Sequence, residues 1–258
     1  MRPWSDAPID PLTGSPSELW VGTYQDGAGA VPVSDDCASS VIAKRLALGT
    51  RLTERASQRL MASMTSPRQY VVYLLAMYGV IRASVPLMSL ARRRSLDQAR
   101  FAPYVQYLER HMKEEADHDE WLLQDLQSVP AYVPSDLPLG SQTIASMVGS
   151  QYYWINFATP LSLLGYMAIL EGCPASAGRV LQIQEVTKLP EQAFRTLLEH
   201  AELDPDHAAE LSQVIDRIEP DSRELAAICL SGLNTIRGLA SVLSECVEYR
   251  SPEEAGGR

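Results

Sequence analysis

The sequence predicts an all-α protein of about six to eight helices, and three observations support this fold class. Apolar residues recur at helical spacing, and no segment alternates between apolar and polar residues as a half-buried strand would. Proline and glycine lie mainly between the helical segments, where they end helices. The chain has 258 residues, 46% of them apolar, which is enough for one large domain with a buried core.

The composition argues against several classes of function. The formal net charge is −10 and no block of basic residues is present, so we expect neither nucleic acid nor an anionic membrane as a partner. The first residues lack the basic and apolar runs of a signal segment. The cysteines are isolated from one another, so we interpret them as reduced thiols of a cytoplasmic protein. They are Cys37, Cys173, Cys229 and Cys246.

Proline and glycine divide the chain into an arm, one helical domain and a tail. Residues 1–36 have no helical or strand period, so we expect an irregular arm. The helical domain is predicted over 37–250, and a frayed tail over 251–258. Its first helices are expected from Asp35 or Asp36 to about Met64, and from Tyr70 to about Leu90 with a kink or break near Pro86.

The second half of the domain alternates between helices and loops in the same way. One helix is expected from about Asp97 or Pro103 to Leu126, followed by a loop over 129–140. No charged residue lies between Asp136 and Glu171, and we interpret this stretch as a helix buried on nearly all sides. Polar residues interrupt it and no Lys or Arg flanks it, which argues against a membrane span. Two more helices are expected, one that begins at Pro190 and one over Ser222 to about Tyr249.

All four histidines of the chain occur in two segments with one spacing. His111–His118 contains Glu115 and His200–His207 contains Asp204, so each segment has a histidine, a carboxylate four residues later and a histidine three residues after that. These positions share one face of a helix, and apolar residues flank both faces. Buried imidazoles and carboxylates are usually paired or bound to metal. The repeat therefore predicts a metal site, and histidines satisfied within the core are the alternative.

The residues alone leave alternatives open at two positions. Glu171 ends the charge-free stretch, either as the partner of a buried group or as a solvated helix end before Gly172 and Pro174. Pro205 lies inside the second histidine segment, where a proline removes a backbone donor from a helix. Asp204 and Pro205 fit the start of a new helix equally well, and Asp204 would then be a capping residue.

With these segments the chain resembles the haem-oxygenase-like diiron oxidases, iron-containing redox enzymes in the fold superfamily that also contains thiaminase II. The resemblance covers roughly residues 60–220 and rests on Glu-x-x-His, a lone Glu on another helix, and His-x3-Asp-x2-His. It implies a haem-oxygenase-like helical bundle that binds two Fe(II) per chain. The implied ligands are Glu115, His118, Glu171, His200, Asp204 and His207. His111 lies outside this set, so we expect it to contact a ligand or the substrate.

The resemblance also implies a function. An enzyme of this family would use O2 as a co-substrate to oxidise a small amino-acid-like or fatty-acid-like metabolite in natural-product biosynthesis. The reaction would be N-oxygenation, desaturation or oxidative C–C cleavage, and mixed nitrogen and oxygen ligands suit iron. An external electron source such as a reductase, and a homodimer, stay open.

Three other functions are alternatives to this one. A metal-independent thiaminase-II-like hydrolase would need a nucleophilic cysteine, for which Cys173 is the candidate, and a non-catalytic helical binding protein is the second alternative. A true haem oxygenase is disfavoured, because it needs an axial histidine on an early helix and no histidine precedes His111.

Overall fold

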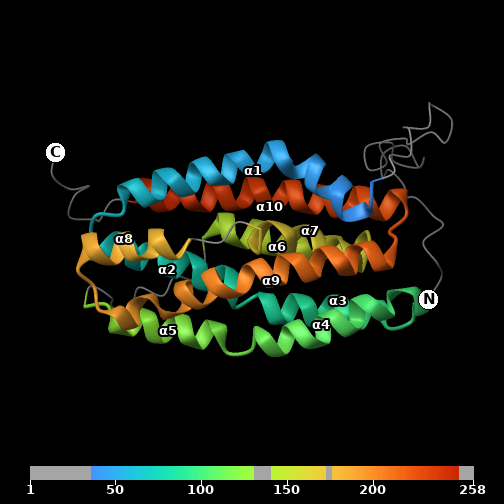
Figure 1. The fold of residues 1–258 in the computed structure, drawn as a ribbon, viewed down its shortest axis with the longest axis horizontal. Coiled ribbons are helices and arrows are strands. Elements are labelled where there is room, and N and C mark those ends of the chain that lie inside the picture. Colours follow the sequence, from blue (N-terminus) through green and yellow to red (C-terminus); the bar gives the residue numbers. More distant parts are fainter. Residues whose placement is uncertain (1–35, 131–140, 173–175, 250–258) are drawn as a thin grey trace, which may run out of the picture. The chain divides into compact units, whose positions relative to one another are not determined.

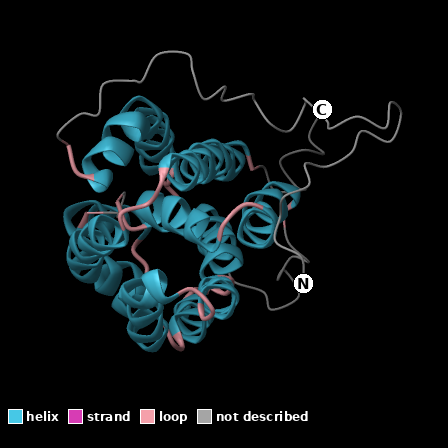
Figure 2. Cartoon of the chain, turned by 90° about the vertical axis from the view of Figure 1, so that its right-hand side faces the viewer, coloured by secondary structure: helices cyan, strands magenta, loops and turns pink. Residues whose placement is uncertain are grey.

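The computed structural model describes residues 36–130, 141–172 and 176–249, with only the backbone of residues 204 and 205. Within these residues the chain forms the α-helices α1–α10 and three short 3-10 helices, with no strand, which confirms the all-α fold. Most helices are seen nearly end-on in Figure 2, as expected for a bundle. The predicted arm up to residue 35, most of the predicted loop 129–140, Cys173 and the predicted tail lie outside the described residues.

The two longest helices, α1 (Ala38–Ser63) and α10 (Ser222–Glu248), pack side by side (Figure 1). The start of α10 is stabilised by a capping box, in which Asp221 accepts hydrogen bonds from backbone N–H groups of the first turn and Glu224 bonds back to the Asp221 N–H. Both helices begin and end close to the predicted positions.

The second predicted helix is broken where proline was expected to act. It consists of α2 (Pro67–Ile81) and α3 (Ser84–Ser95), with the break at residues 82–83. Pro86 cannot donate a backbone hydrogen bond, and in a continuous helix its ring would clash with the carbonyl of Arg82. The break near Pro86 is therefore confirmed.

The helix expected to carry the first histidine segment is also divided, and this was not predicted. The 3-10 helix η1 (Ala99–Phe101) leads into α4 (Ala102–Glu114), and α5 (His118–Ser128) follows after three residues. Asp117 has a φ of 68°, in the left-handed region, which a right-handed helix cannot continue through. The expectation of one regular helix through His111–His118 is therefore wrong.

The charge-free stretch forms two helices instead of one. It contains α6 (Gln142–Phe157), the 3-10 helix η3 (Pro160–Ser162) and α7 (Leu163–Leu170). The chain leaves α6 before Pro160, which cannot donate a backbone hydrogen bond. Helix α7 is buried on nearly all sides, as predicted, whereas α6 is not. The exposed aromatic residues of α6 are Tyr152, Tyr153 and Phe157.

The second histidine segment lies on one continuous helix. After α8 (Ala177–Thr187), the 3-10 helix η4 (Glu191–Phe194) leads into α9 (Arg195–Ile218), close to the predicted start at Pro190. Helix α9 continues through residues 204 and 205 without a break. The alternative in which Asp204 and Pro205 begin a new helix is therefore wrong.

Two described stretches, Pro67–Ser95 and Ser222–Glu248, have the length and apolar composition of a membrane span. Both contribute to the core of the bundle, where Leu74 and Ile228 are fully buried. The core helix of a soluble protein passes the same test, so these stretches are weak evidence for a membrane.

Candidate metal centre

Three regions of the chain bring the predicted ligands into one part of the bundle. His111 lies in the last turn of α4, Glu115 directly follows this helix, and His118 is the first residue of α5. Glu171 follows the last residue of α7, and α9 carries both His200 and His207. Asp204 also lies on α9, but the position of its side chain is outside the described part of the structure.

The histidines and Glu115 form two groups that could each hold a metal ion. One group consists of His111, Glu115 and His207, and the other of Glu115, His118 and His200; in each, the candidate ligand atoms lie within 4.8 Å of one another. Glu115 belongs to both groups. A carboxylate has two oxygens, so this residue can offer one oxygen to each group.

Glu171 lies beside the first group, through a contact with His111. The distance from His111 Nε2 to Glu171 Oε1 is 3.2 Å, and both residues are buried. The other carboxylate oxygen, Oε2, is buried without a hydrogen-bond partner in the described part of the chain. The side chain of Glu171 is thus turned towards the histidines, and this end of α7 is not solvated.

In the second group, hydrogen bonding fixes the orientation of one imidazole. His200 Nδ1 is 2.8 Å from the carbonyl oxygen of Thr196, and since a carbonyl can only accept, Nδ1 carries the hydrogen. The Nε2 atom of His200 then has the lone pair that could bind a metal ion. The rings of His118 and His200 lie 4.9 Å apart, and His118 Nδ1 is 3.3 Å from Glu115 Oε2.

The sequence analysis did not single out Glu114. Its Oε2 atom lies 3.5 Å from His111 Nδ1 and 3.6 Å from His207 Nε2, so it adds a second carboxylate near the first group. The side chain is 40% exposed and sits at the outer side of the site. Its position next to Glu115 in the sequence is the signal that could have identified it, but it lies outside the regular spacing of the histidine segments.

Residues 122–237 match a family described as iron-containing redox enzymes. Of the proposed ligands, this match includes Glu171, His200, Asp204 and His207. A domain of unknown function from Shewanella denitrificans, described as having a heme oxygenase-like fold, superposes with a TM-score of 0.70 and 16% sequence identity. The comparison covers 83% of this chain and 94% of that domain. The matched segment is thus similar to iron-containing redox enzymes, and the similar structure shows that the fold is haem-oxygenase-like.

A second similar structure is a TenA homolog from Pseudomonas syringae pv. tomato, with a TM-score of 0.65 and 12% identity over 86% of this chain and 98% of that one. At this level of identity the likeness shows the shared fold only. No curated protein matches the chain.

The electrostatics of the site suit metal ligation. Burial lowers the pKa of His200, and the charge of Glu115 and the bond to Thr196 oppose this only in part, so the imidazole is biased towards its neutral, metal-binding form. Burial raises the pKa of Glu115, but the hydrogen bond and charge of His118, with the charges of His200 and His111, outweigh burial and hold the pKa below its usual value. Glu115 is therefore a carboxylate.

The donor set also fits iron. Nitrogen and oxygen atoms are mixed, as redox-active iron accepts, and no described cysteine belongs to either group. Two buried donor atoms, His207 Nδ1 and Glu171 Oε2, have no hydrogen-bond partner in the described part of the chain. Such atoms are costly to bury and usually have a protein, water or metal partner. The bundle thus contains a polar cluster that a bound metal would complete.

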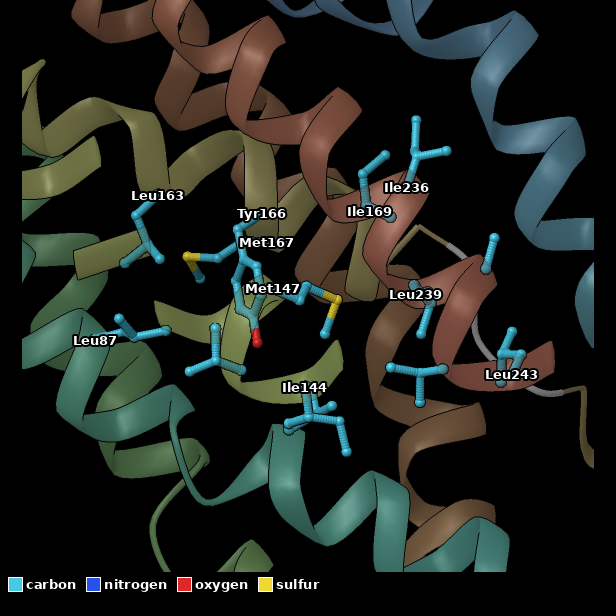
Figure 3. Packing of buried hydrophobic residues seen from close by; sticks show 14 of the residues in the cluster. Leu87, Ile144, Met147, Leu163, Tyr166, Met167, Ile169, Ile236, Leu239 and Leu243 are labelled. Carbon is cyan, nitrogen blue, oxygen red and sulfur yellow. The ribbon is translucent and has the colours of Figure 1, made fainter. Parts of the chain in front are cut away.

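A cavity of about 510 Å³ lies beside the two groups of candidate ligands. His111, Glu115, Glu171 and His200 form part of its wall. Much of the remaining wall is apolar and comes from α2, α3, α7 and α10, and Figure 3 shows part of it. The labelled residues that line the cavity are Leu87, Leu163, Tyr166, Met167, Leu239 and Leu243. Glu54 and Arg179 add charge to the lining.

Proposed function

We propose that this protein is a non-haem diiron oxidase or oxygenase that uses O2 to oxidise a small metabolite. The observation that carries the proposal is the position of Glu115, which belongs to both groups of candidate ligands. A shared carboxylate is the arrangement that holds two metal ions close together. The proposed ligands are Glu115, His118, Glu171, His200, Asp204 and His207.

In this proposal His111 orients a ligand and is not itself bound to iron. An Nε2–H of His111 donates to Glu171 Oε1, which leaves the buried Oε2 atom of Glu171 for the metal. The pKa of His111 supports this role. Burial lowers it, but the hydrogen bond and charge of Glu171, with the charges of Glu115 and Glu114, outweigh burial and raise it.

When bound, two ferrous ions would supply electrons and the place where O2 is activated. The residues of the chain hold this place away from bulk water. Tyr107 is 1% exposed and its ring stacks on His111, with ring centroids 5.3 Å apart. Buried side chains of α7 line the cavity beside the site. A dry and rigid surrounding limits side reactions of an activated oxidant.

The cavity supports a substrate with an apolar body and a charged group. Its volume of about 510 Å³ lies within the range of small-molecule sites. The apolar wall suits a fatty-acid-like chain or the side chain of an amino-acid-like molecule, and Arg179 is placed to receive a carboxylate. N-oxygenation, desaturation and oxidative C–C cleavage are all compatible with such a substrate, and natural-product biosynthesis is the proposed setting.

Anaerobic loading with Fe(II), metal analysis and a pulse of O2 test the proposal. We expect two irons per chain and rapid consumption of O2 followed by stopped-flow absorption. Glu115→Gln should lose most of the iron, because the variant removes the shared carboxylate. Glu54→Gln, a change elsewhere in the cavity wall, is the control and should keep both irons. One iron or fewer per wild-type chain, or no reaction with O2, contradicts a diiron oxidase.

A further inference from the structure

A buried carboxylate outside the two groups of candidate ligands connects α5 and α9, two of the helices that carry these ligands. Asp125 lies on α5, two turns after His118, and is 1% exposed. Its Oδ2 atom accepts a hydrogen bond of 2.8 Å from the backbone N–H of Thr196, the second residue of α9. The first N–H groups of a helix have no partner within that helix. Asp125 therefore caps α9 from a different helix.

The sequence around the start of α9 does not provide a local cap. The residue at the N-cap position is Phe194, whose side chain cannot accept a hydrogen bond. A local Ser, Thr or Asn is the usual solution and costs less than burying a carboxylate. Burial does raise the pKa of Asp125, against the bonds from Thr196 and the charge of Arg195. Capping alone does not account for a carboxylate in this position.

Thr196 is also the residue that orients His200. Its N–H donates to Asp125, and its carbonyl oxygen accepts from His200 Nδ1 at 2.8 Å. Asp125 and His118 lie on the same helix, and the rings of His118 and His200 are 4.9 Å apart. The position of one imidazole relative to the other is thus set through Asp125 and one residue of backbone.

A second contact holds the same two helices together. The guanidinium of Arg195 lies over the ring of Trp121, 4.4 Å from its centroid. Trp121 in turn contacts His118, with ring centroids 4.4 Å apart. Consecutive residues of α9, Arg195 and Thr196, therefore dock on α5 beside His118 and at Asp125. His207 lies about three turns further along α9 and has no such connection to α5 among the described contacts.

We propose that Asp125 is a positioning residue that sets the metal affinity of the group formed by Glu115, His118 and His200. It does so by fixing the start of α9 and the Nδ1–H form of His200, and it leaves the group with His207 largely unaffected. This inference rests on the proposed diiron site. The metal affinity of one position would depend on Asp125 and that of the other would not, although Asp125 belongs to neither group.

Titration of the metal-free protein with Co(II), followed by its visible absorption, tests the inference. Wild type should bind two Co(II). Asp125→Ala should weaken one of the two binding steps by about 10- to 100-fold, which is typical when a residue that supports a ligand is lost. Asp125→Asn keeps an acceptor oxygen and should stay within about 3-fold of wild type. If the alanine variant does not fold, Asp125→Ser, whose shorter side chain does not reach Thr196, should show the same selective loss.

Ser231→Ala is the matched control, because it removes another buried side-chain hydrogen bond, from Ser231 to Gln151, between α10 and α6. It should lower stability while leaving both Co(II) steps unchanged. Nitrogen-15 NMR of the histidines adds a readout without metal: one ring locked as Nδ1–H should be present in wild type and Ser231→Ala, and lost in Asp125→Ala. Fewer than two Co(II) in wild type overturns the proposed site itself. Two unchanged steps in Asp125→Ala, with a normal wild type, overturn the role of Asp125 alone.

Discussion

Each proposed metal position depends on Glu115 and on histidines that belong to that position alone. His118 and His207 are both buried and belong to different groups. We predict that His118→Ala or His207→Ala abolishes O2-dependent activity, because each removes a nitrogen ligand from one ion. Helical circular dichroism should change little, since both helices keep their apolar contacts. Normal turnover by either variant would show that the assignment is wrong.

His111 could be a metal ligand or a residue that orients Glu171. It belongs to one group of candidate ligands, but the proposal gives it the orienting role. His111→Gln keeps a donor that can reach Glu171, so we predict that this variant retains most of its iron and changes the reaction rate or substrate affinity. Metal analysis and steady-state kinetics measure the two effects. His207→Gln, which removes a proposed ligand, is the comparison. Loss of half the iron in His111→Gln would identify His111 as a ligand.

The two histidine segments differ in regularity: the first, predicted as one regular helix, is broken, whereas the second, for which a break at Pro205 was one alternative, is continuous. The first segment has no proline or glycine, yet the chain breaks at residues 115–117. Aspartate tolerates the left-handed conformation of Asp117 better than most residues, but it occurs in regular helices too, so no local pattern announces the break. Glu115 is the first residue of the break and His118 the first residue after it, and the two side chains are in contact.

The second segment contains a proline and still forms a regular helix. The missing hydrogen bond at Pro205 is a local cost, whereas burial of Leu211, Val214 and Ile215 fixes the rest of α9 against the core. Tertiary packing of this kind routinely overrides local preference. The sequence pattern could therefore indicate the candidate ligands and the segments that carry them, but not the place where such a helix is irregular.

Pro205 nevertheless weakens the hydrogen-bond ladder of α9, and this has a measurable consequence. We predict that residues 198–208 exchange amide hydrogens faster than the middle of α10 in metal-free protein, and that iron slows the exchange. Pro205→Ala should restore the ladder and raise the unfolding free energy by about 1–2 kcal/mol. Chemical denaturation and hydrogen exchange measure both effects. Equal protection of 198–208 and α10 without metal would mean that the site is rigid before metal binds.

At the scale of the whole molecule, the site exists only because helices distant in the sequence pack closely. Spacing along the chain shows which residues share a helix face, but the contacts of Glu114 with His207 and of Asp125 with Thr196 join helices with no common pattern. These contacts depend on the shape of the packed bundle. Charge-free composition did indicate that α7 is buried, but it left open whether Glu171 at its end is buried or solvated.

The placement of Glu171 depends on how closely α7 approaches α10. A Cβ atom on Gly165 would overlap the carbonyl oxygen of Ile228 and meet the backbone of Gly232. These are backbone atoms that cannot rotate away, so α7 would have to shift. We predict that Gly165→Ala lowers the unfolding free energy by about 2–3 kcal/mol and also weakens iron binding, because Glu171 follows the last residue of α7.

Gly149 offers a control in another helix of the same bundle. It lies in the interior of α6, where a Cβ atom would meet nothing within 4 Å. Gly149→Ala should therefore leave iron binding unchanged and raise the unfolding free energy by about 0.5–1 kcal/mol, since alanine is the better helix former. Denaturant midpoints and metal analysis of both variants decide the matter. If Gly165→Ala is as stable as wild type, α7 does not touch α10 at this point, and Glu171 is held by other contacts.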